Sequence, residues 1–231
     1  NLWFVRPGDA NEATNAWRIA IERRGGPVAL ALTRQKLPTL PGTAERSREG
    51  VARGGYVLRE ASSEADGGQP ALILIATGSE PQLAIGAADE LERDGIPSRV
   101  VSLPCWELFD AQDRAYRDRV LPPAARRRVS VEAGVSLGWE RYVGDEGAIV
   151  GLDHYGASAP AATIFEKFGF TAGRVADIGR NVVREGLRGP IPTLEPGHLP
   201  AVPGTPPSSL HEGGGSGTER DASAGRDPGH S

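Results

Sequence analysis

The chain has few of the residues from which several common kinds of site are built. Its 231 residues include one cysteine, which excludes an internal disulfide and a zinc site made of cysteines. Its four histidines are scattered and leave little for a histidine-rich metal site. Lys and Arg number 26 against 30 Asp and Glu, and the net charge of −4 gives no overall basic field that would attract nucleic acid or an anionic membrane. We therefore expect neither nucleic acid nor a membrane as a partner.

The sequence also lacks long apolar runs. No run approaches the ~18–20 apolar residues of a membrane-spanning helix, and the start has neither the basic nor the apolar region of a signal peptide. We expect a cytoplasmic protein. The apolar residues that are present, 39% of the chain, are enough for a sizeable core. The first residue is Asn rather than Met, which indicates that the sequence is a piece of a longer chain.

The composition changes sharply near Gly189. Residues 189–231 contain 9 Gly and 8 Pro among 43 residues, with few aliphatic side chains between them. Such a segment cannot bury enough apolar surface to offset the entropy lost when its backbone is ordered. The composition therefore predicts a disordered Pro/Gly-rich tail over 189–231.

Before the tail, helical patterns alternate with apolar runs. Residues 9–12 have the form of a capping box and begin a helix. The helical spacing predicts a buried face made of Ala13, Ala16, Trp17, Ala20 and Ile21. The continuous apolar run 28–33 then predicts a strand covered on both faces. Residues 38–53 are polar and turn-rich, which is typical of a linker.

Residues 54–188 continue this alternation over the length of a full domain. Strands are predicted at 56–58, 71–76, 99–103, 128–132 and 148–150, and helices at 82–93, 112–120, 161–168 and 174–188. Apolar strands that alternate with helices favour an α/β fold, with a mostly parallel sheet and helices on both faces. A single helix and strand cannot fold alone, and residues 1–37 are therefore interpreted as the end of an incomplete α/β domain.

The most interesting candidate for chemistry is Arg34, which directly follows the apolar run 28–33. Ligands of open parallel sheets gather beyond the carboxyl ends of the strands. A guanidinium at such a place can hold a phosphate or a carboxylate through two parallel hydrogen bonds. The alternative is an arginine that pairs with a nearby carboxylate or is simply solvated, and position alone favours that alternative.

Other features favour a structural role over a functional one. The turn at 77–80 is interpreted as a helix cap rather than an anion site, because it lacks the glycines of nucleotide-binding loops. Glu132 ends a strand without a partner carboxylate, which favours a cap or an interface. Cys105 is expected to be a buried packing residue, His154 is a lone loop histidine, and 126–128 (Arg-Arg-Arg) is expected to be a solvated edge. The residues alone therefore show no catalytic machinery.

A series of motifs resembles transketolase in amino-acid sequence, order and spacing. The resemblance covers residues 1 to about 187. The motifs are RPGDANE at 6–12, LALTRQKLP at 30–38, GGYV at 54–57, IATGSE at 75–80, SLPCWELF at 102–109, VEAG at 131–134, YGASAP at 155–160 and FGFT at 168–171.

The resemblance implies an enzyme of three α/β domains that transfers a two-carbon ketol unit between sugar phosphates. Its cofactors would be thiamine diphosphate and a divalent cation, Mg²⁺ or Ca²⁺, and it would act as a homodimer in the pentose phosphate pathway. Residues 1–37 would end the pyrimidine-binding domain, 38–53 would be the linker, and 54–188 would be the C-terminal domain.

One site residue carries over from the resemblance. Arg34, in the motif Thr-Arg-Gln, matches the arginine of the family that holds the phosphate of the sugar substrate. The residues of the family that perform catalysis or bind the cofactor and the metal have no counterpart in this segment. We therefore expect the chain alone to be inactive and to bind no cofactor.

Two alternatives stay open. One is a non-catalytic subunit or interaction module of a split thiamine-diphosphate enzyme, although such a subunit would normally include the complete pyrimidine-binding domain. The other is a related pyruvate- or deoxyxylulose-type thiamine enzyme, which shares the C-terminal fold. The residues of the motifs CWELF and ASAP favour transketolase over the second alternative.

Overall fold

A six-stranded sheet is the centre of the computed structural model, which describes residues 1–62 and 69–193. The order of its strands is β3-β5-β4-β6-β7-β8. The strands are β3 (Tyr56–Arg59), β4 (Leu72–Ala76), β5 (Ser98–Ser102), β6 (Arg128–Val131), β7 (Ala148–Val150) and β8 (Gly189–Ile191). All neighbouring strands are parallel except β3, which runs antiparallel to β5. The predicted α/β fold with a mostly parallel sheet is confirmed.

The central strand β4 shows why the sheet needs a layer of helices on each face. Its sequence Leu-Ile-Leu-Ile-Ala is buried at every position, and successive side chains of a strand point to opposite faces. Leu72, Leu74 and Ala76 belong to one hydrophobic cluster. Ile73 and Ile75 belong to another. Both faces of the sheet are therefore apolar and covered.

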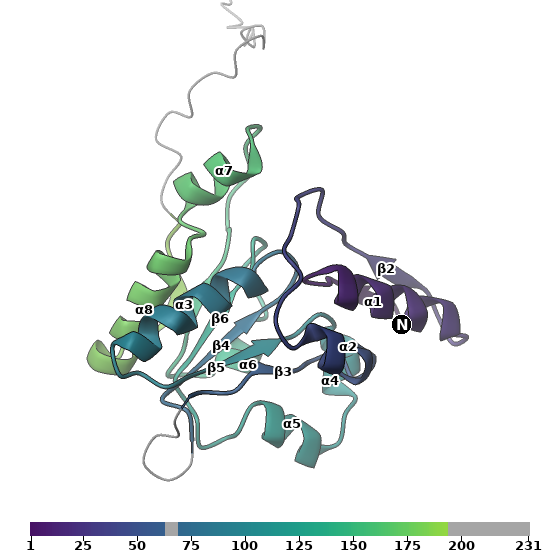
Figure 1. Cartoon of the computed structure of the whole chain (residues 1–231), viewed down its shortest axis with the longest axis horizontal. Helices are drawn as coiled ribbons and strands as arrows, with labels where there is room; N and C mark the ends of the chain where they lie inside the picture. The colour runs from purple at the N-terminus through teal and green to yellow at the C-terminus, as the bar shows by residue number, and fades with distance from the viewer. Residues whose placement is uncertain (63–68, 194–231) are drawn as a thin grey trace, which may run out of the picture. The chain divides into compact units, whose positions relative to one another are not determined.

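Two helices cover the first face and three short helices cover the second. On the first face, α3 (Pro81–Arg93) and α8 (Ala172–Glu185) pack side by side (Figure 1). The helices of the second face are α4 (Trp106–Asp110), α5 (Arg114–Val120) and α6 (Glu140–Val143). The helix α7 (Ala161–Phe168) precedes α8. The predicted helices at 82–93, 112–120, 161–168 and 174–188 correspond to α3, α5, α7 and α8, whereas α4 and α6 were not predicted.

Residues 1–53 form a smaller group of elements. The strands β1 (Trp3–Val5) and β2 (Val28–Leu30) pair in parallel, and α1 (Ala10–Glu22) packs on α2 (Thr43–Ala52). The predicted start of α1 is confirmed, because the Asp9 side chain accepts a hydrogen bond from the backbone N–H of Glu12 at 2.9 Å.

The helix α2 lies within residues 38–53, where the sequence predicts only a linker. Part of its contact with α1 is polar: Asn11 Nδ2 donates to Thr43 Oγ1 and Asn15 Nδ2 donates to Ser47 Oγ, both at 2.9 Å. Val51 also lies in one apolar cluster with Ala16 and Ile19 of α1. A search for apolar periodicity gives little signal for a helix with one large apolar side chain among its buried residues.

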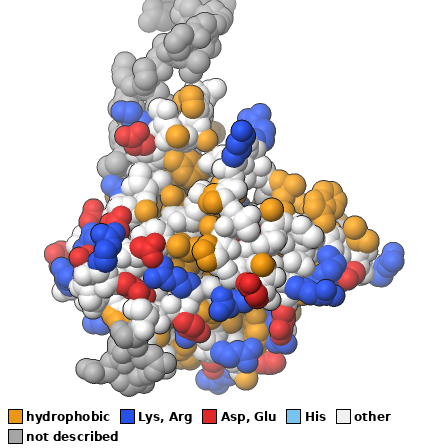
Figure 2. All heavy atoms as spheres, viewed as in Figure 1, with side chains coloured by type: hydrophobic (Ala, Val, Ile, Leu, Met, Phe, Trp, Pro, Cys, Tyr) orange, Lys and Arg blue, Asp and Glu red, His pale blue; other side chains and the backbone are white. Residues whose placement is uncertain are grey.

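Two expectations about burial near the start of the chain are wrong. The run 28–33 gives only the three-residue strand β2, and each of its residues is half-buried. On α1 the buried residues are Glu12, Ala16 and Ile19, whereas Trp17 and Ile21 are 54% and 70% exposed. Figure 2 shows hydrophobic side chains on the surface formed by α1 and β2. No element within the described residues covers this side of α1.

The strand β8 shows that the prediction placed the start of the tail, at residue 189, too early. Its residues pair with β7 at the edge of the sheet, so 189–191 are part of the folded domain and not of a disordered segment. The remaining part of the predicted tail, 194–231, lies outside the described residues. Within the described residues, no helix has both the length and the apolar character needed to cross a membrane.

A buried carboxylate joins α1 to the sheet. Glu12 is 1% exposed and accepts hydrogen bonds from Tyr56 Oη on β3 at 2.7 Å, from Ser102 Oγ on β5 at 2.6 Å and from the Gly8 N–H at 2.7 Å. Burial raises the pKa of Glu12 above the ordinary value of a carboxyl group. The three donors act against this shift, and the charge of Asp9 adds to it.

We predict that Glu12 makes the stability of the fold depend on pH. A carboxyl group whose pKa is higher in the folded chain binds its proton more tightly there. Its contribution to the free energy of unfolding is therefore full below the unfolded pKa of about 4.5 and is lost as the pH rises through the folded pKa. The variant Glu12→Gln keeps a neutral side chain that can accept from Gly8 and donate to the two hydroxyls. The free energy of unfolding of the wild type minus that of Glu12→Gln should fall as the pH rises above 4.5, measured by urea unfolding.

Glu49→Gln serves as the matched control, because Glu49 is 71% exposed and pairs with Arg53 on the same helix. Its effect on the free energy of unfolding should stay within about 0.5 kcal/mol at each pH. Glu12→Ala leaves three donors without their acceptor and should cost about 3 kcal/mol or more. A difference between wild type and Glu12→Gln that does not change with pH would contradict the raised pKa.

Candidate functional site

Arg34 lies in the loop after β2, beyond the carboxyl end of the strand pair β1–β2. Its side chain is exposed and forms no ion pair or hydrogen bond with another residue of the described ranges. Lys36 is exposed in the same loop. Figure 2 shows Lys and Arg side chains standing out from the surface where this loop lies in Figure 1. An anion in solution can therefore reach the Arg34 guanidinium, and its role in phosphate binding stays a prediction.

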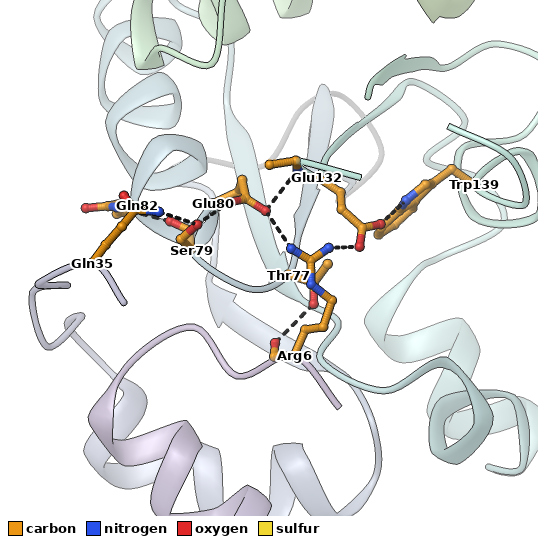
Figure 3. Close-up of polar contacts among 9 residues, drawn as sticks. Arg6, Gln35, Thr77, Ser79, Glu80, Gln82, Glu132 and Trp139 are labelled. Carbon is orange, nitrogen blue, oxygen red and sulfur yellow. Dashed lines mark hydrogen bonds and ion pairs between the residues drawn. The ribbon is translucent and has the colours of Figure 1, made fainter. Parts of the chain in front are cut away.

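The residue after Arg34 ties the loop to the second group of elements. The chain bends at Arg34 and Gln35, where Thr33 Oγ1 accepts a hydrogen bond from the Gln35 N–H at 3.1 Å. The Gln35 side-chain amide donates to Ser79 Oγ at 3.2 Å. Ser79 belongs to the turn between β4 and α3, so this hydrogen bond connects the loop to the six-stranded sheet (Figure 3).

Buried groups hold Ser79 in place. Its side chain donates a hydrogen bond to Glu80 Oε1, and Gln82 donates to its carbonyl oxygen at 3.0 Å. Glu80 is fully buried, and its other carboxylate oxygen accepts from the Ala133 N–H at 3.1 Å and lies 3.5 Å from the Arg6 guanidinium. Burial raises the pKa of Glu80, while Arg6, Ser79 and Ala133 act to lower it.

Arg6 also connects the two groups of elements. Its guanidinium forms ion pairs with Glu80 and with Glu132 (Figure 3). Glu132 also accepts a hydrogen bond from the indole N–H of Trp139. The backbone of Arg6 takes part as well, because its carbonyl oxygen accepts from the Gly78 N–H at 2.9 Å. Arg6 is therefore fixed at both its side chain and its main chain.

All of these contacts lie at the carboxyl edge of the sheet. Glu80 follows β4, Pro104 follows β5 and Glu132 follows β6. The carbonyl oxygen of Pro104 accepts a hydrogen bond from the Arg6 N–H at 2.8 Å. The strands β5 and β6 lie on opposite sides of β4, and open α/β sheets hold their ligands where the strand order changes direction in this way. In this chain that position is taken by Arg6.

A cavity of about 210 Å³ adjoins Arg6 and Glu132. Its walls are largely apolar, with Trp106 and Leu103 among them, and the side chain of Leu137 at its lining is 76% exposed. The Arg6 and Glu132 side chains in this wall already pair with each other. The other polar side chains of the lining, Thr77 and Glu107, also have hydrogen-bond partners within the protein. The polar groups of the cavity therefore do not point to one class of ligand.

The structural roles expected for the turn, Cys105 and Glu132 are confirmed. The turn at 77–80 uses its backbone N–H groups within the protein, since the Gly78 N–H is bonded to Arg6 and the Glu80 N–H to Thr77. Cys105 is fully buried, and burial raises its pKa to about 12, which makes it unsuited to act as a nucleophile. Glu132 has the interface role described above.

The prediction for the basic run 126–128 is correct for Arg126 and wrong for Arg128. Arg126 is exposed and pairs with Asp145 and Glu146. Arg128 is partly buried and donates to four backbone carbonyl oxygens, those of Leu121, Pro122, Ala125 and Tyr142. His154 is exposed and lies edge-on against the Phe168 ring.

Sequence reasoning missed the residues that surround the Arg34 loop. Arg6 and Gln35 both lie in motifs that carry the family resemblance, but no residue pattern pairs them with Glu80 and Ser79. One signal was available for Arg6, because a basic residue beyond the end of an apolar strand is the same signal that indicated Arg34. It was not used because the strand β1 was not predicted.

The described residues do not fit thiamine diphosphate and its metal. A divalent cation that binds a diphosphate needs several oxygen ligands in one place. Within residues 1–62 and 69–193, no group of three or more His, Cys, Asp or Glu side chains could hold a metal ion. The carboxylates of Glu80, which is buried, and of Glu132, which is partly buried, are paired with Arg6. We therefore assign these residues no part in binding the cofactor.

Comparison with known proteins agrees with the resemblance. Residues 54–171 match the family model of the transketolase-like TK C-terminal domain. The transketolase of Geobacillus stearothermophilus is 51% identical over 175 residues, which are 76% of this chain and 26% of that protein. The transketolase of Mycobacterium tuberculosis H37Rv is 55% identical over 177 residues, which are 76% of this chain and 25% of that protein. The chain thus spans about a quarter of the length of the curated relatives that it matches.

Solved structures give the same assignment. The transketolase from Leishmania mexicana matches with a TM-score of 0.71 and 39% identity over 84% of this chain and 27% of that one. A Pichia stipitis transketolase in complex with sedoheptulose-7-phosphate matches with a TM-score of 0.70 and 40% identity over 79% of this chain and 25% of that one. A split-gene transketolase, described as an inactive beta4 tetramer, shares the fold at 22% identity and a TM-score of 0.63, over 79% of this chain and 58% of that one. The chain therefore belongs to the transketolase family, whose C-terminal domain its residues 54–171 match.

Proposed function

We propose that this chain supplies the contact with the substrate phosphate in a transketolase. The enzyme would transfer a two-carbon ketol unit between sugar phosphates, using thiamine diphosphate and a divalent cation. The observation that carries the proposal is the exposed Arg34 guanidinium, which lies beyond the carboxyl end of β2 and has no carboxylate partner among the described residues. A similar protein, the P. stipitis transketolase, was crystallised with a sugar phosphate, sedoheptulose-7-phosphate.

The chemistry of a guanidinium suits this role. Arginine stays charged at every physiological pH, and its planar fork can give a phosphate two parallel hydrogen bonds. The phosphate of a sugar lies several bonds away from the carbons that react. Holding it orients the substrate without contact with the bonds that form and break, and this lowers the entropic part of the barrier. Arg34 is therefore a substrate-binding residue and not a catalytic one.

The remaining functional assignments rest on the family. The intact protein would be a cytoplasmic homodimer of the pentose phosphate pathway, and its cofactor and reacting groups would come from outside the described residues. Residues 1–37 would be the end of the pyrimidine-binding domain, 38–53 a linker that contains α2, and 54–191, which includes β8, the C-terminal domain. Exposed apolar side chains on the first of these segments, such as Trp17 and Ile21, suit a surface that the rest of that domain covers.

A second candidate function is that of a separate subunit in a split enzyme. The fold shared with the split-gene transketolase and the exposed apolar side of α1 favour a chain that docks on another polypeptide. Both candidates give Arg34 the same role. They differ in whether the partner domain is covalently attached, and the DNA upstream of the codon for Asn1 distinguishes them.

We predict that the purified 231-residue chain does not transfer ketol groups. Within residues 1–62 and 69–193 no cluster of side chains could hold the metal ion of the cofactor, and the resemblance gives the cofactor-binding residues of the family no counterpart here. The chain is mixed with xylulose 5-phosphate, ribose 5-phosphate, thiamine diphosphate and Mg²⁺. The measurement is the formation of the three-carbon aldose phosphate that xylulose 5-phosphate leaves when it gives up two carbons. Turnover by the chain alone, at a rate that follows its concentration, would contradict this prediction.

We predict that Arg34 discriminates phosphorylated from unphosphorylated ketoses. The test enzyme joins this whole chain to the upstream three quarters of the G. stearothermophilus transketolase, in place of the matching C-terminal segment. Losing one charge-assisted contact in Arg34→Gln should cost about 2 kcal/mol of binding, which is a rise of about 30-fold in KM for xylulose 5-phosphate. The KM for xylulose, which has no phosphate, should stay within about two-fold, because that substrate never makes the contact.

Lys36→Gln is the control for this experiment, because it removes the same charge from an exposed position in the same loop. Its effect on KM for xylulose 5-phosphate should stay below about three-fold, since only the long-range field changes. Arg34→Lys keeps the charge but loses the planar fork and should fall between the wild type and Arg34→Gln. If Arg34→Gln changes the KM for xylulose 5-phosphate and the KM for xylulose by the same factor, the proposal is wrong.

A further inference from the structure

The loop that carries Arg34 has few attachments within the described residues. The Ala31 N–H donates to the Val5 carbonyl oxygen at 2.9 Å at one end, and the Leu40 N–H donates to Asp9 Oδ2 at 2.9 Å at the other. Among the hydrogen bonds of the described residues between these ends, the one from Gln35 to Ser79 reaches another element. This attachment lies next to Arg34 in the sequence.

The Ser79 hydroxyl is oriented to accept this hydrogen bond. A hydroxyl has one proton and two lone pairs. The proton of Ser79 is directed to Glu80 Oε1, which leaves a lone pair for the Gln35 amide. Glu80 is itself fixed by the Ala133 N–H and by Arg6. The attachment point is therefore part of a connected and buried polar network, which leaves little freedom to its members.

We propose that the carboxyl edge of the C-terminal sheet acts as a positioning site for the Arg34 loop, through the hydrogen bond from Gln35 to a Ser79 hydroxyl that Glu80 orients. This inference rests on the proposed role of Arg34 as the contact with the substrate phosphate. The edge where related sheets hold a small ligand here holds Arg6 and Gln35 of the preceding segment. Gln35 and Ser79 are positioning residues, because they act through Arg34 and do not touch the substrate.

The effect of this attachment is to order the loop before the substrate arrives. Fixing the backbone of a free loop costs entropy for each residue, and binding a substrate through a free loop would include that cost. A loop already held at Gln35 avoids part of this entropy cost when the substrate binds. Loss of the attachment should therefore weaken the binding of phosphorylated substrates and leave the chemical step unchanged.

The kinetic test uses the same joined enzyme and the same pair of ketoses. Gln35→Ala should raise KM for xylulose 5-phosphate by about 3- to 10-fold, with kcat and the KM for xylulose within about two-fold. Ser79→Ala should have a similar effect, and the double variant should be no worse than either single variant, because both remove one interaction. Ser79→Thr keeps the hydroxyl and should restore the KM. Gln112→Ala is the matched control, because Gln112 donates to the Leu108 carbonyl oxygen and has no contact with the loop.

A second measurement tests the attachment on the chain itself, without any assay of activity. Backbone hydrogen exchange in residues 31–39 should be faster in Gln35→Ala than in the wild type and unchanged in Gln112→Ala. Unchanged exchange in Gln35→Ala, or an unchanged KM for xylulose 5-phosphate, would overturn the positioning role. Arg34→Gln separates the two proposals. If it raises KM for xylulose 5-phosphate while Gln35→Ala leaves that KM unchanged, only this inference is overturned. If Arg34→Gln also leaves that KM unchanged, the proposed function and this inference are both overturned.

Discussion

The ion pairs of Arg6 with Glu80 and Glu132 are the interaction on which the arrangement of the chain depends. A charged group leaves water at a high cost, and partners of opposite charge with good hydrogen bonds offset it. Each member here has further partners: Glu80 has Ala133 and Ser79, and Glu132 has the Trp139 indole. Removing Arg6 would leave two carboxylates facing one another at the edge of the sheet. The docking of the N-terminal elements on that edge is therefore specific as well as favourable.

Glu12 forms a second junction of a different kind. It reaches the sheet through the Tyr56 and Ser102 hydroxyls. It has no cation as a partner in the part of the chain that the structure describes, so burial favours its protonated form. The Arg6 junction acts at the carboxyl edge of the sheet, whereas the Glu12 junction acts through the antiparallel pair β3–β5. Because the two junctions lie at separate places, together they fix the orientation of the N-terminal elements relative to the sheet, which a single junction would leave free to rotate. The carboxyl edge of β1–β2 is thereby brought to the carboxyl edge of β4, β5 and β6, and the Arg34 loop leaves from the place where these edges meet.

Hydrophobic pattern predicted the parts of the fold that depend on burying apolar surface. The strand β4 and the helices α3 and α7 were found because their apolar residues repeat with the period of a strand or a helix. The strand β8 was missed because its sequence, Gly-Pro-Ile, lies in a stretch whose composition predicts disorder, and the strand β1 was also missed. The helix α2 was missed because Val51 is the one large apolar side chain among its four buried residues. The burial of α1 was wrong because the pattern shows that Trp17 and Ile21 are apolar but not which surface covers them.

For the candidate site, the sequence named a residue but could not predict the contacts around it. Family resemblance identifies Arg34, and the structure adds that its neighbour Gln35 is bonded to a serine 44 positions away in the sequence. Contacts of this range depend on how separate elements dock, and no local pattern encodes them. Nevertheless they decide whether a side chain on an exposed loop is held in a useful position. The described part of the C-terminal domain contributes no reacting group that we can identify, yet the polar network of Glu80 and Ser79 reaches the loop that carries Arg34. On the proposal made above, such a domain would act on a reaction through the position of a residue that it does not contain.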